Sequence, residues 1–438
     1  MPVHFGRRLL SRRQILASAG IAATFSVVQG RAQPLTGSAS VTVLRAQKAN
    51  ANLLGPNAAA TPVWAYNGAI PGMVLHAKRG EELRVQLQNE LPEPTSMHWH
   101  GLRVPNAMDG VPGLTQSPIA PGGNFEYRFR LPDAGTFWLH PVGSHAGQTG
   151  RGLRGVLIVE EAEPIGVDRD LLLFLEDWSL TRDGTLSDAS DASATITINA
   201  MPAIDLPVRT NERLRLRIVN ATTARALALR IEGHEPTVVA IDGQPSEPFP
   251  AREGRVVLGP GNRIDLMVDA RLPPGSRAAI MAQDGQAEIS IARFVYEPMA
   301  ARAAPLAAPK RLPANPLPER LDLRAASRHE FSIELNARPL PPVHERKPLF
   351  GARRGRVVVL ACQNRTDKMQ SIHLHGHHAR LLDRLDDGWK PFWLDTLMVA
   401  PRQTERIAFL ADNAGKWLIA ARSVAAPSAP TDAWFEVT

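Results

Sequence analysis

A strand-like run followed by an asparagine occurs three times in this chain of 438 residues. Residues 82–88 and 213–219 alternate polar and apolar side chains, as half-buried β-strands do, and residues 357–360 form a shorter apolar run. The asparagines that follow are Asn89, Asn220 and Asn364, which lie 131 and 144 residues apart. The recurrence predicts three copies of one β-domain.

The chain is therefore predicted to be all-β, with three consecutive β-sandwiches at residues 37–163, 164–300 and 321–438. Residues 301–320 contain five prolines and six alanines and show no alternation, which predicts a linker between the second and third copies. The 37 prolines and 33 glycines of the whole chain agree with many short strands joined by turns.

Residues 1–32 have the pattern of a cleaved secretory signal. Several arginines precede an uncharged run over residues 14–29, and a small-x-small site ends at Ala32. The stretch around Arg12 and Arg13 resembles the twin-arginine export signal, which predicts a periplasmic protein in a cell with two membranes. The alternative is a short membrane anchor, but the run is too short to span a bilayer of about 30 Å. No later run approaches 18 apolar residues, so we expect no transmembrane anchor in the mature form.

Charge and cysteine content exclude several classes of function. Five leader arginines account for most of the net charge of +7, and removing them leaves +2. Because no Lys/Arg block stands out, we expect no nucleic-acid partner. The single cysteine, Cys362, excludes a disulfide framework, a cysteine-based zinc site and an iron–sulfur cluster.

Two His-x-His pairs are the strongest chemical signal. His98 and His100 flank a tryptophan, His373 and His375 flank a leucine, and each pair is followed by a glycine. Residues i and i+2 of a strand point to the same side, so each pair presents two imidazoles on one face at a spacing suited to metal ions. One such pair is common by chance on a protein surface, whereas two in the same context favour a metal site.

At this point the chain resembles the multicopper oxidase family, relatives of laccase with three cupredoxin domains of Greek-key type. The similarity covers almost all of the chain after residue 32. The motifs that carry it are residues 67–72, 98–101, 109–116, 135–140, 214–221, 241–243, 259–263, 373–377, 393–396 and 412–417.

The resemblance implies a blue copper and a trinuclear copper cluster that reduces dioxygen, but the ligands of the blue copper are missing. The family's histidine stands at Gln370 here, its cysteine at Ala421, its second histidine at Ala426 and its axial methionine at Thr431. Cys362 lies on a different strand without flanking histidines, and we interpret it as a buried structural cysteine.

The trinuclear cluster is predicted to be damaged unevenly. By resemblance, His98 and His373 hold the type 2 copper, and both are present. One type 3 copper would use His100, His140 and the position of Arg422, and the other Val142, His375 and Ala420. We therefore predict about one copper per chain and not the full four. Asp109 matches the family's acid for proton delivery, although Asp-Gly is also a plain turn signal. His145 is an alternative inward-pointing histidine.

Three functions remain open from the sequence. The first is an exported copper-binding protein with a remnant type 2/type 3 site between the first and third domains. The second is a copper-free periplasmic scaffold for cell division or the envelope, with an envelope protein as its partner. The third is a copper-dependent oxidoreductase with an unconventional route for electrons. The family oxidises phenols or metal ions with oxygen as acceptor, and the sequence names no substrate.

Overall fold

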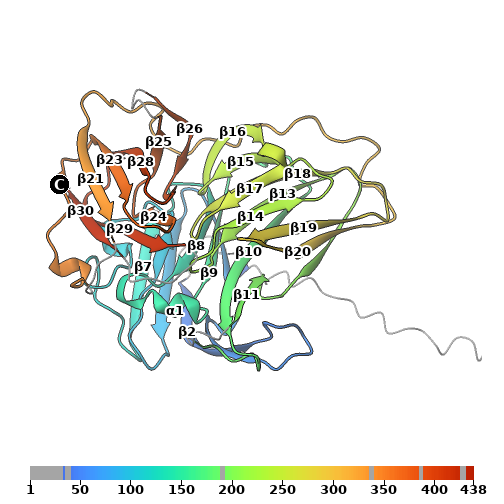
Figure 1. Ribbon diagram of the computed structural model, residues 1–438, viewed down its shortest axis with the longest axis horizontal. Coiled ribbons are helices and arrows are strands. Elements are labelled where there is room, and N and C mark those ends of the chain that lie inside the picture. The colour runs from blue at the N-terminus through green and yellow to red at the C-terminus, as the bar shows by residue number, and fades with distance from the viewer. Residues whose placement is uncertain (1–32, 35–40, 188–192, 335–339, 384–387, 425–430) are drawn as a thin grey trace, which may run out of the picture.

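The structure is a computed structural model that describes residues 33–34, 41–187, 193–334, 340–383, 388–424 and 431–438. It is built almost entirely of β-strands, which form six sheets. Figure 1 shows the first third of the chain in blue and cyan below and between the other two, with the second in green and yellow on the right and the third in orange and red on the left. The predicted leader and Ala426 lie outside the described residues.

The first sandwich encloses an apolar core between a five-stranded and a four-stranded sheet. In spatial order, the five-stranded sheet contains β1 (Gln33–Pro34), β4 (Val74–Lys78), β9 (Gly155–Glu160), β8 (Gly135–His140) and β6 (His98–His100). The four-stranded sheet contains β3 (Thr61–Tyr66), β2 (Thr42–Ala51), β5 (Glu82–Asn89) and β7 (Asn124–Arg130). Along β5 every second side chain is buried, as the alternation predicted.

The second sandwich has the longest strands. Its first sheet contains β11 (Ser193–Ile198), β10 (Arg169–Leu180), β13 (Glu212–Asn220), β18 (Arg263–Ala270), β15 (Thr237–Ile241) and β16 (Gln244–Pro250). Its second sheet contains β12 (Ile204–Val208), β20 (Ala287–Tyr296), β19 (Arg277–Asp284), β14 (Leu227–Ile231) and β17 (Arg255–Leu258).

The third sandwich is made of two five-stranded sheets. One contains β21 (Ser327–Ile333), β23 (Arg356–Asn364), β28 (Thr404–Ala411), β25 (Ala379–Leu382) and β26 (Trp389–Leu394). The other contains β22 (Gly351–Ala352), β30 (Ala433–Val437), β29 (Gly415–Ser423), β24 (Gln370–Leu374) and β27 (Thr396–Val399). Cys362 is fully buried in this core on β23, which confirms its structural interpretation.

The three recurring asparagines have the same role in each sandwich. The amide of Asn89 donates to the carbonyls of Glu93 and Ile119, and its Oδ1 accepts from the backbone N–H two residues on. Asn220 and Asn364 repeat this arrangement, each tying the end of its strand to a carbonyl from a distant segment. An Asx turn thus closes the equivalent strand in all three sandwiches.

The expectation that residues 213–219 form a half-buried strand was wrong, because β13 is buried along both faces. Its leucines pack in the second core. Two of its arginines face the first sandwich, where Arg217 donates to the hydroxyl of Thr136 on β8 and Arg215 pairs with Glu161. The polar face of this strand is covered by a neighbouring domain instead of water.

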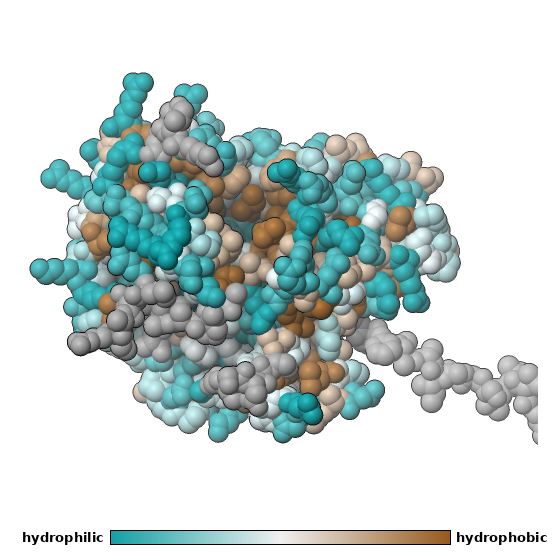
Figure 2. Space-filling model, in the orientation of Figure 1, coloured by the Kyte–Doolittle hydropathy of each residue, from teal (hydrophilic) through white to brown (hydrophobic). Residues whose placement is uncertain are grey.

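The predicted linker, residues 301–320, contains no helix or strand but packs closely on the first two sandwiches. Leu312 is buried against β15 and β18, and Asn315 exchanges hydrogen bonds with the backbone of Ala134. Figure 2 shows hydrophobic side chains at the surface gathered mainly where the second sandwich meets the other two. Among the described residues, no helix is long and apolar enough to cross a membrane.

Candidate metal centre

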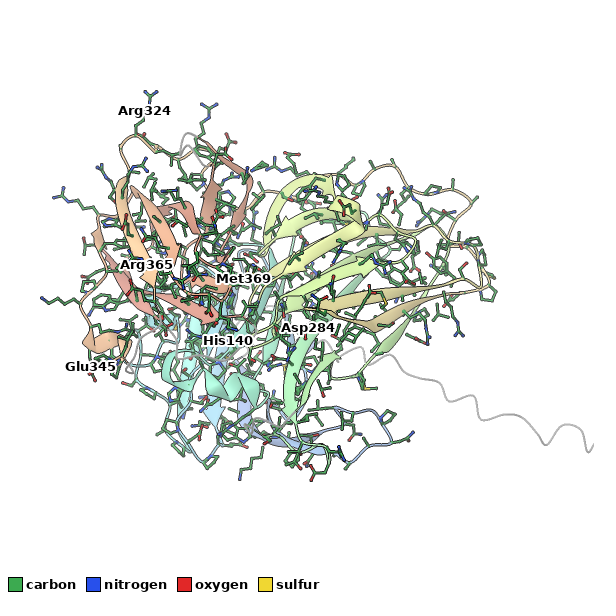
Figure 3. All side chains as sticks on the ribbon, in the orientation of Figure 1. His140, Asp284, Arg324, Glu345, Arg365 and Met369 are labelled. Carbon is green, nitrogen blue, oxygen red and sulfur yellow. The ribbon has the colours of Figure 1, made fainter. Side chains whose placement is uncertain are left out.

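The structure brings together the five histidines predicted from the sequence. His98 and His100 lie on β6, and His140 lies at the end of the neighbouring β8, where it pairs in register with His98. His373 lies on β24 of the third sandwich, with His375 directly after it. Four of the five are buried, and His140 is partly buried. Figure 3 shows His140 in the middle of the molecule, well away from Arg324 and Glu345 at its periphery.

The glycine after each His-x-His pair allows a close approach, to the second sandwich at Gly101 and to β29 of the same sandwich at Gly376. Gly101 has φ of +89°, and a Cβ there would lie 2.0 Å from Nη2 of Arg263. Gly376 has φ of +65°, and its Cβ would lie 2.2 Å from the ring of Trp417. Only glycine meets both demands, so these two positions are part of how the pairs are placed.

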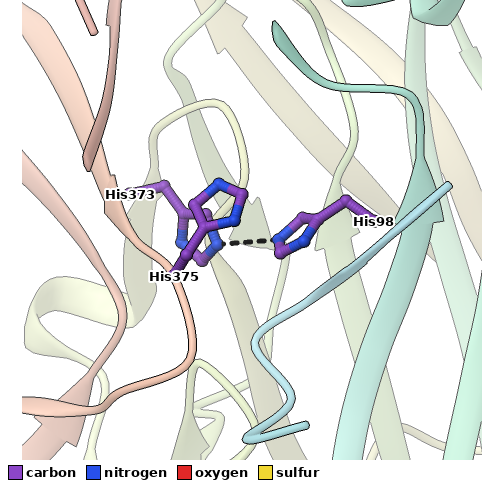
Figure 4. A group of neighbouring side chains, drawn as sticks. All are labelled: His98, His373 and His375. Atoms are coloured by element: carbon purple, nitrogen blue, oxygen red, sulfur yellow. Dashed lines mark hydrogen bonds between the residues drawn. The ribbon is translucent and has the colours of Figure 1, made fainter. Parts of the chain in front are cut away.

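His98 and His373 meet across the boundary of the first and third sandwiches. Their Nε2 atoms are 3.1 Å apart, as the dashed line in Figure 4 marks. Nδ1 of His98 lies 2.9 Å from the backbone carbonyl of Asp109, and Nδ1 of His373 lies 3.1 Å from that of Asp395. A carbonyl only accepts, so both Nδ1 atoms carry the proton. Both Nε2 atoms then present lone pairs, a pairing that a cation between them would stabilise.

His375 completes a group of three imidazoles. Its ring stacks on that of His98 with centroids 3.9 Å apart, and its Nδ1 lies 3.0 Å from a carboxylate oxygen of Asp109. Its Nε2 is buried and has no hydrogen-bond partner among the described residues. One ring nitrogen from each of His98, His373 and His375 lies within 4.8 Å of the others. A buried imidazole nitrogen without a partner, close to two other histidines, is an arrangement that a metal ion satisfies.

His100 and His140 form a second pair. Nδ1 of His100 lies 3.0 Å from Nε2 of His140. The outer nitrogens are held by Thr396, 3.0 Å from Nε2 of His100, and by the carbonyl of Pro141, 3.0 Å from Nδ1 of His140. The ring of Trp138 stacks on His140 at 3.9 Å. This pair also points two ring nitrogens at one place.

Two buried carboxylates organise the imidazoles. Asp109 contacts Nδ1 of both His98 and His375, at 3.1 and 3.0 Å. Burial raises the pKa of Asp109, but the neighbouring imidazoles lower this pKa by more than burial raises it, so the carboxyl stays ionised. Asp109 directly follows the short 3-10 turn η1 (Asn106–Met108), which confirms the turn interpretation, and its role in proton delivery stays a prediction.

Asp395 is a carboxylate to which the sequence alone gave no role. It lies 3.3 Å from Nδ1 of His373 and 3.5 Å from Nε2 of His100, and it forms a two-point ion pair with Arg263 at 2.8 and 2.6 Å. Burial raises its pKa, and Arg263 together with the histidines holds it well below its usual range. Both residues belong to motifs noted in the sequence, but only the fold places them behind the histidines.

Burial keeps four of the imidazoles neutral. It lowers the pKa of His375 to about 3, and burial and the neighbouring rings lower the pKa of His100 and His140 well below the ordinary value. The pKa of His373 is lowered for the same reasons. Neutral imidazole is the form that binds metals.

The predicted type 3 ligand positions that carry no histidine make other contacts within the protein. Val142 and Ala420 belong to one apolar cluster with Leu418 and Trp434. Arg422 is held by an ion pair with Asp432, 2.6 Å between Nη1 and Oδ1. His145 does not join the histidines, because it lines a separate, larger cleft beside Trp64 and Glu93.

Two of the positions that the resemblance assigns to blue-copper ligands, Gln370 and Ala421, make contacts within the protein. Gln370 donates its amide to the hydroxyl of Thr366 at 3.1 Å, and Ala421 is buried in the third core. Cys362 lies in the same core, where burial raises the pKa of its thiol to about 12. A thiol that stays protonated does not replace the thiolate that a blue copper needs.

The chain is similar to known multicopper oxidases in both sequence and structure. Three sequence models described as multicopper oxidase match residues 46–164, 170–296 and 313–421. The chain is 28% identical to multicopper oxidase MmcO of Mycobacterium tuberculosis, across 92% of this chain and 88% of that protein. The crystal structure of a multi-copper oxidase from Pseudomonas thermotolerans is similar with a TM-score of 0.82 and 32% identity, covering 92% of this chain and all of that chain. Lac15 from a marine microbial metagenome gives 0.77 and 33%, covering 90% and 100%.

The chain therefore belongs to the multicopper oxidase family, whose cofactor is copper, and the prediction of three cupredoxin-like domains is confirmed.

Proposed function

We propose that this chain is a copper-binding member of the multicopper oxidase family that holds about one copper ion with His98, His373 and His375. The observation that carries the proposal is the closeness of three ring nitrogens whose rings are held from behind. Each of the three Nδ1 atoms is bound by a carbonyl or carboxylate acceptor, which leaves each Nε2 with a free lone pair, and one ring nitrogen of each histidine lies within 4.8 Å of the others. Acceptors of this kind fix the tautomer of metal-binding histidines in other proteins.

The separations suit a metal. If the metal–nitrogen bonds are about 2.0 Å, as in zinc–imidazole sites, two nitrogens 3.1 Å apart subtend about 100° at the ion, between square-planar and tetrahedral values. When bound, copper supplies one-electron redox chemistry. The chain's own surroundings hold His373 and His375 neutral and keep Asp109 ionised beside them.

We further propose that turnover of laccase type does not take place. In the family, electrons reach the cluster from a thiolate-bound copper, and the residues at that position here are Gln370, Ala421 and Thr431. Without the thiolate, the copper-loaded protein is expected to lack the intense blue colour.

The test is the copper content per chain of protein purified from copper-supplemented cells, with electron paramagnetic resonance of the same samples. We expect about one copper in the wild type, with a type 2 signal, and less than a tenth of that in His98→Ala/His373→Ala. His76→Ala is the matched control, because His76 lies outside the cluster, 3.7 Å from Glu160.

Other outcomes point to the alternatives. Two coppers per chain would mean that His100 and His140 also hold an ion, and three or four would mean that lost ligands are replaced from elsewhere. Absence of copper, with both proteins equally stable, would support the copper-free scaffold. Oxidation of a phenol with matching oxygen uptake, abolished by His98→Ala, would support an oxidase with another route for electrons.

We propose that the protein is exported with cleavage after Ala32, in which case it works in the periplasm of a cell with two membranes. The proposal depends on the arginine-rich, acid-free leader. The intact mass of the mature protein is expected to correspond to a chain that starts at Gln33. Arg12→Lys/Arg13→Lys is expected to leave uncleaved protein in the cytoplasm, and unchanged export would contradict a twin-arginine route.

A further inference from the structure

A cavity of about 360 Å³ opens directly beside the imidazoles. Its lining includes His100, His140, His373 and His375 together with Arg422 and Ser423. Val142 and Ala420 also line it, at two positions where the family has ligand histidines. The volume falls within the range of small-ligand pockets. Replacement of two large polar side chains by small apolar ones thus leaves room next to the remaining ligands.

Arg422 is the one permanently charged side chain among the described residues that line this cavity, and it pairs with Asp432 behind the lining. None of the described residues that line it is acidic, and Arg422 contributes a fixed positive charge. Both hydrogen bonds that Arg422 makes to the described chain leave from Nη1, to the carbonyl of Ala421 and to Asp432. A guanidinium has five N–H donors in a planar fork, so further donors remain for a ligand.

We propose that this cavity binds a small anion, a carboxylate or an inorganic oxyanion, with its negative charge on Arg422 and facing the imidazoles. The inference rests in part on the proposed function, because a copper ion held by the imidazoles would add a second positive charge to the same cavity. Two cations at one cavity repel each other, and an anion bound there is attracted to both.

Access to the cavity is available past α1 (Gly147–Gly150), which borders both this cavity and the larger cleft next to it. A Cβ added at Gly147 would meet no atom within 4 Å, so a side chain at this position extends into open space. Gly147→Leu is therefore expected to narrow the approach without touching a histidine or Arg422. Gly147→Ala is its matched control.

The test uses azide as the probe and the full chain as the protein. Copper content is measured first for every sample. The copper-loaded protein is then titrated with azide, and binding is monitored by the azide-to-copper absorption band. The bound azide is displaced with benzoate in one series and with phosphate in another. Displacement at a lower concentration of benzoate identifies a carboxylate as the preferred ligand, and displacement at a lower concentration of phosphate identifies an inorganic oxyanion.

The decisive variant is Arg422→Gln/Asp432→Asn, which removes the guanidinium without leaving the buried Asp432 carboxylate unpaired. We expect at least fivefold weaker azide binding with unchanged copper content, and a similar loss in Gly147→Leu but not in Gly147→Ala. A loss of less than fivefold in the double variant would overturn the inference even though copper is bound.

A copper-free arm separates this inference from the proposed function. If the wild type holds no copper, the proposed function fails, and the copper-free protein is titrated with benzoate and with phosphate by calorimetry. Binding that the double variant abolishes would still support the anion site. Absence of binding, or binding that does not depend on Arg422, would overturn it.

Discussion

The buried ion pairs between β13 and β18, on the face of the second sandwich that meets the first, predict a large loss of stability on one isosteric change, Asp265→Asn. Asp265 is 1% exposed and lies 2.6 Å from Nη2 of Arg215 and 3.6 Å from Nη1 of Arg217. It also accepts a hydrogen bond from Thr136 at 2.9 Å. Both arginines come from the strand whose polar face is covered by the first sandwich.

The magnitude follows from two opposing effects. At 2.6 Å and an effective dielectric of 20, the attraction to Arg215 alone is about 6 kcal/mol. Neutralising Asp265 removes that attraction but also removes the cost of burying a carboxylate, and Glu161, 2.8 Å from Arg215, still compensates part of the charge. Removal of one member of a buried pair typically costs about 3–5 kcal/mol, and we expect a loss of about 4 kcal/mol.

The assay is thermal unfolding followed by calorimetry. For a domain of this size, about 4 kcal/mol corresponds to a fall of about 10 °C or more in the Tm of the transition that contains the second sandwich. Asp205→Asn is the matched control, because Asp205 pairs with Arg293 at 2.8 Å but both side chains are about half exposed, 54% and 44%. An exposed pair contributes about 1 kcal/mol at most. Equal shifts in the two variants would refute the reasoning.

Three further predictions concern buried groups elsewhere. Burial raises the pKa of Glu176 from 4.5 to about 7, so the folded state binds a proton that the unfolded state lacks between these pH values. Its contribution to stability is complete below pH 4.5 and falls by about 3 kcal/mol as pH rises to 7. Glu176→Gln should flatten the dependence of the free energy of unfolding on pH in this range. An unchanged dependence would contradict the raised pKa of Glu176. The thiol of Cys362 should react with a maleimide only after denaturation, because it is buried with a pKa of about 12; fast labelling of the native protein would show otherwise. Gly376→Ala should cost about 1–3 kcal/mol by pushing on Trp417 and should lower the copper content, because it displaces the neighbouring histidine; metal analysis and Tm together check this.

Much of the architecture was predictable because its signals are local. The alternation at residues 82–88 follows from one face of a strand meeting a core, and the asparagine after it marks the same Asx turn in three places. The His-x-His-Gly pairs are equally local, since strand geometry alone puts both rings on one side. The grouping of both pairs with His140 came instead from the resemblance to the multicopper oxidases.

What the sequence could not supply depends on contacts between domains. An arginine that alternates with leucine looks the same whether water or another sandwich covers it, so the burial of Arg215 was missed. Asp395 and Arg263 are separated by 132 residues, and only docking of the third sandwich on the second makes them a pair behind the histidines. The apolar cluster around Val142 and Ala420 likewise joins two sandwiches.

The distance along the chain between His98 and His373, 275 residues, sets a limit on when the site can exist. A ribosome that adds about 5–20 residues per second reaches His373 about 15–55 s after His98. During that interval the first sandwich can fold with its own histidines, but the partner imidazoles and Asp395 have not yet been made. The complete three-imidazole site is therefore a property of the finished chain, and it cannot capture an ion during synthesis.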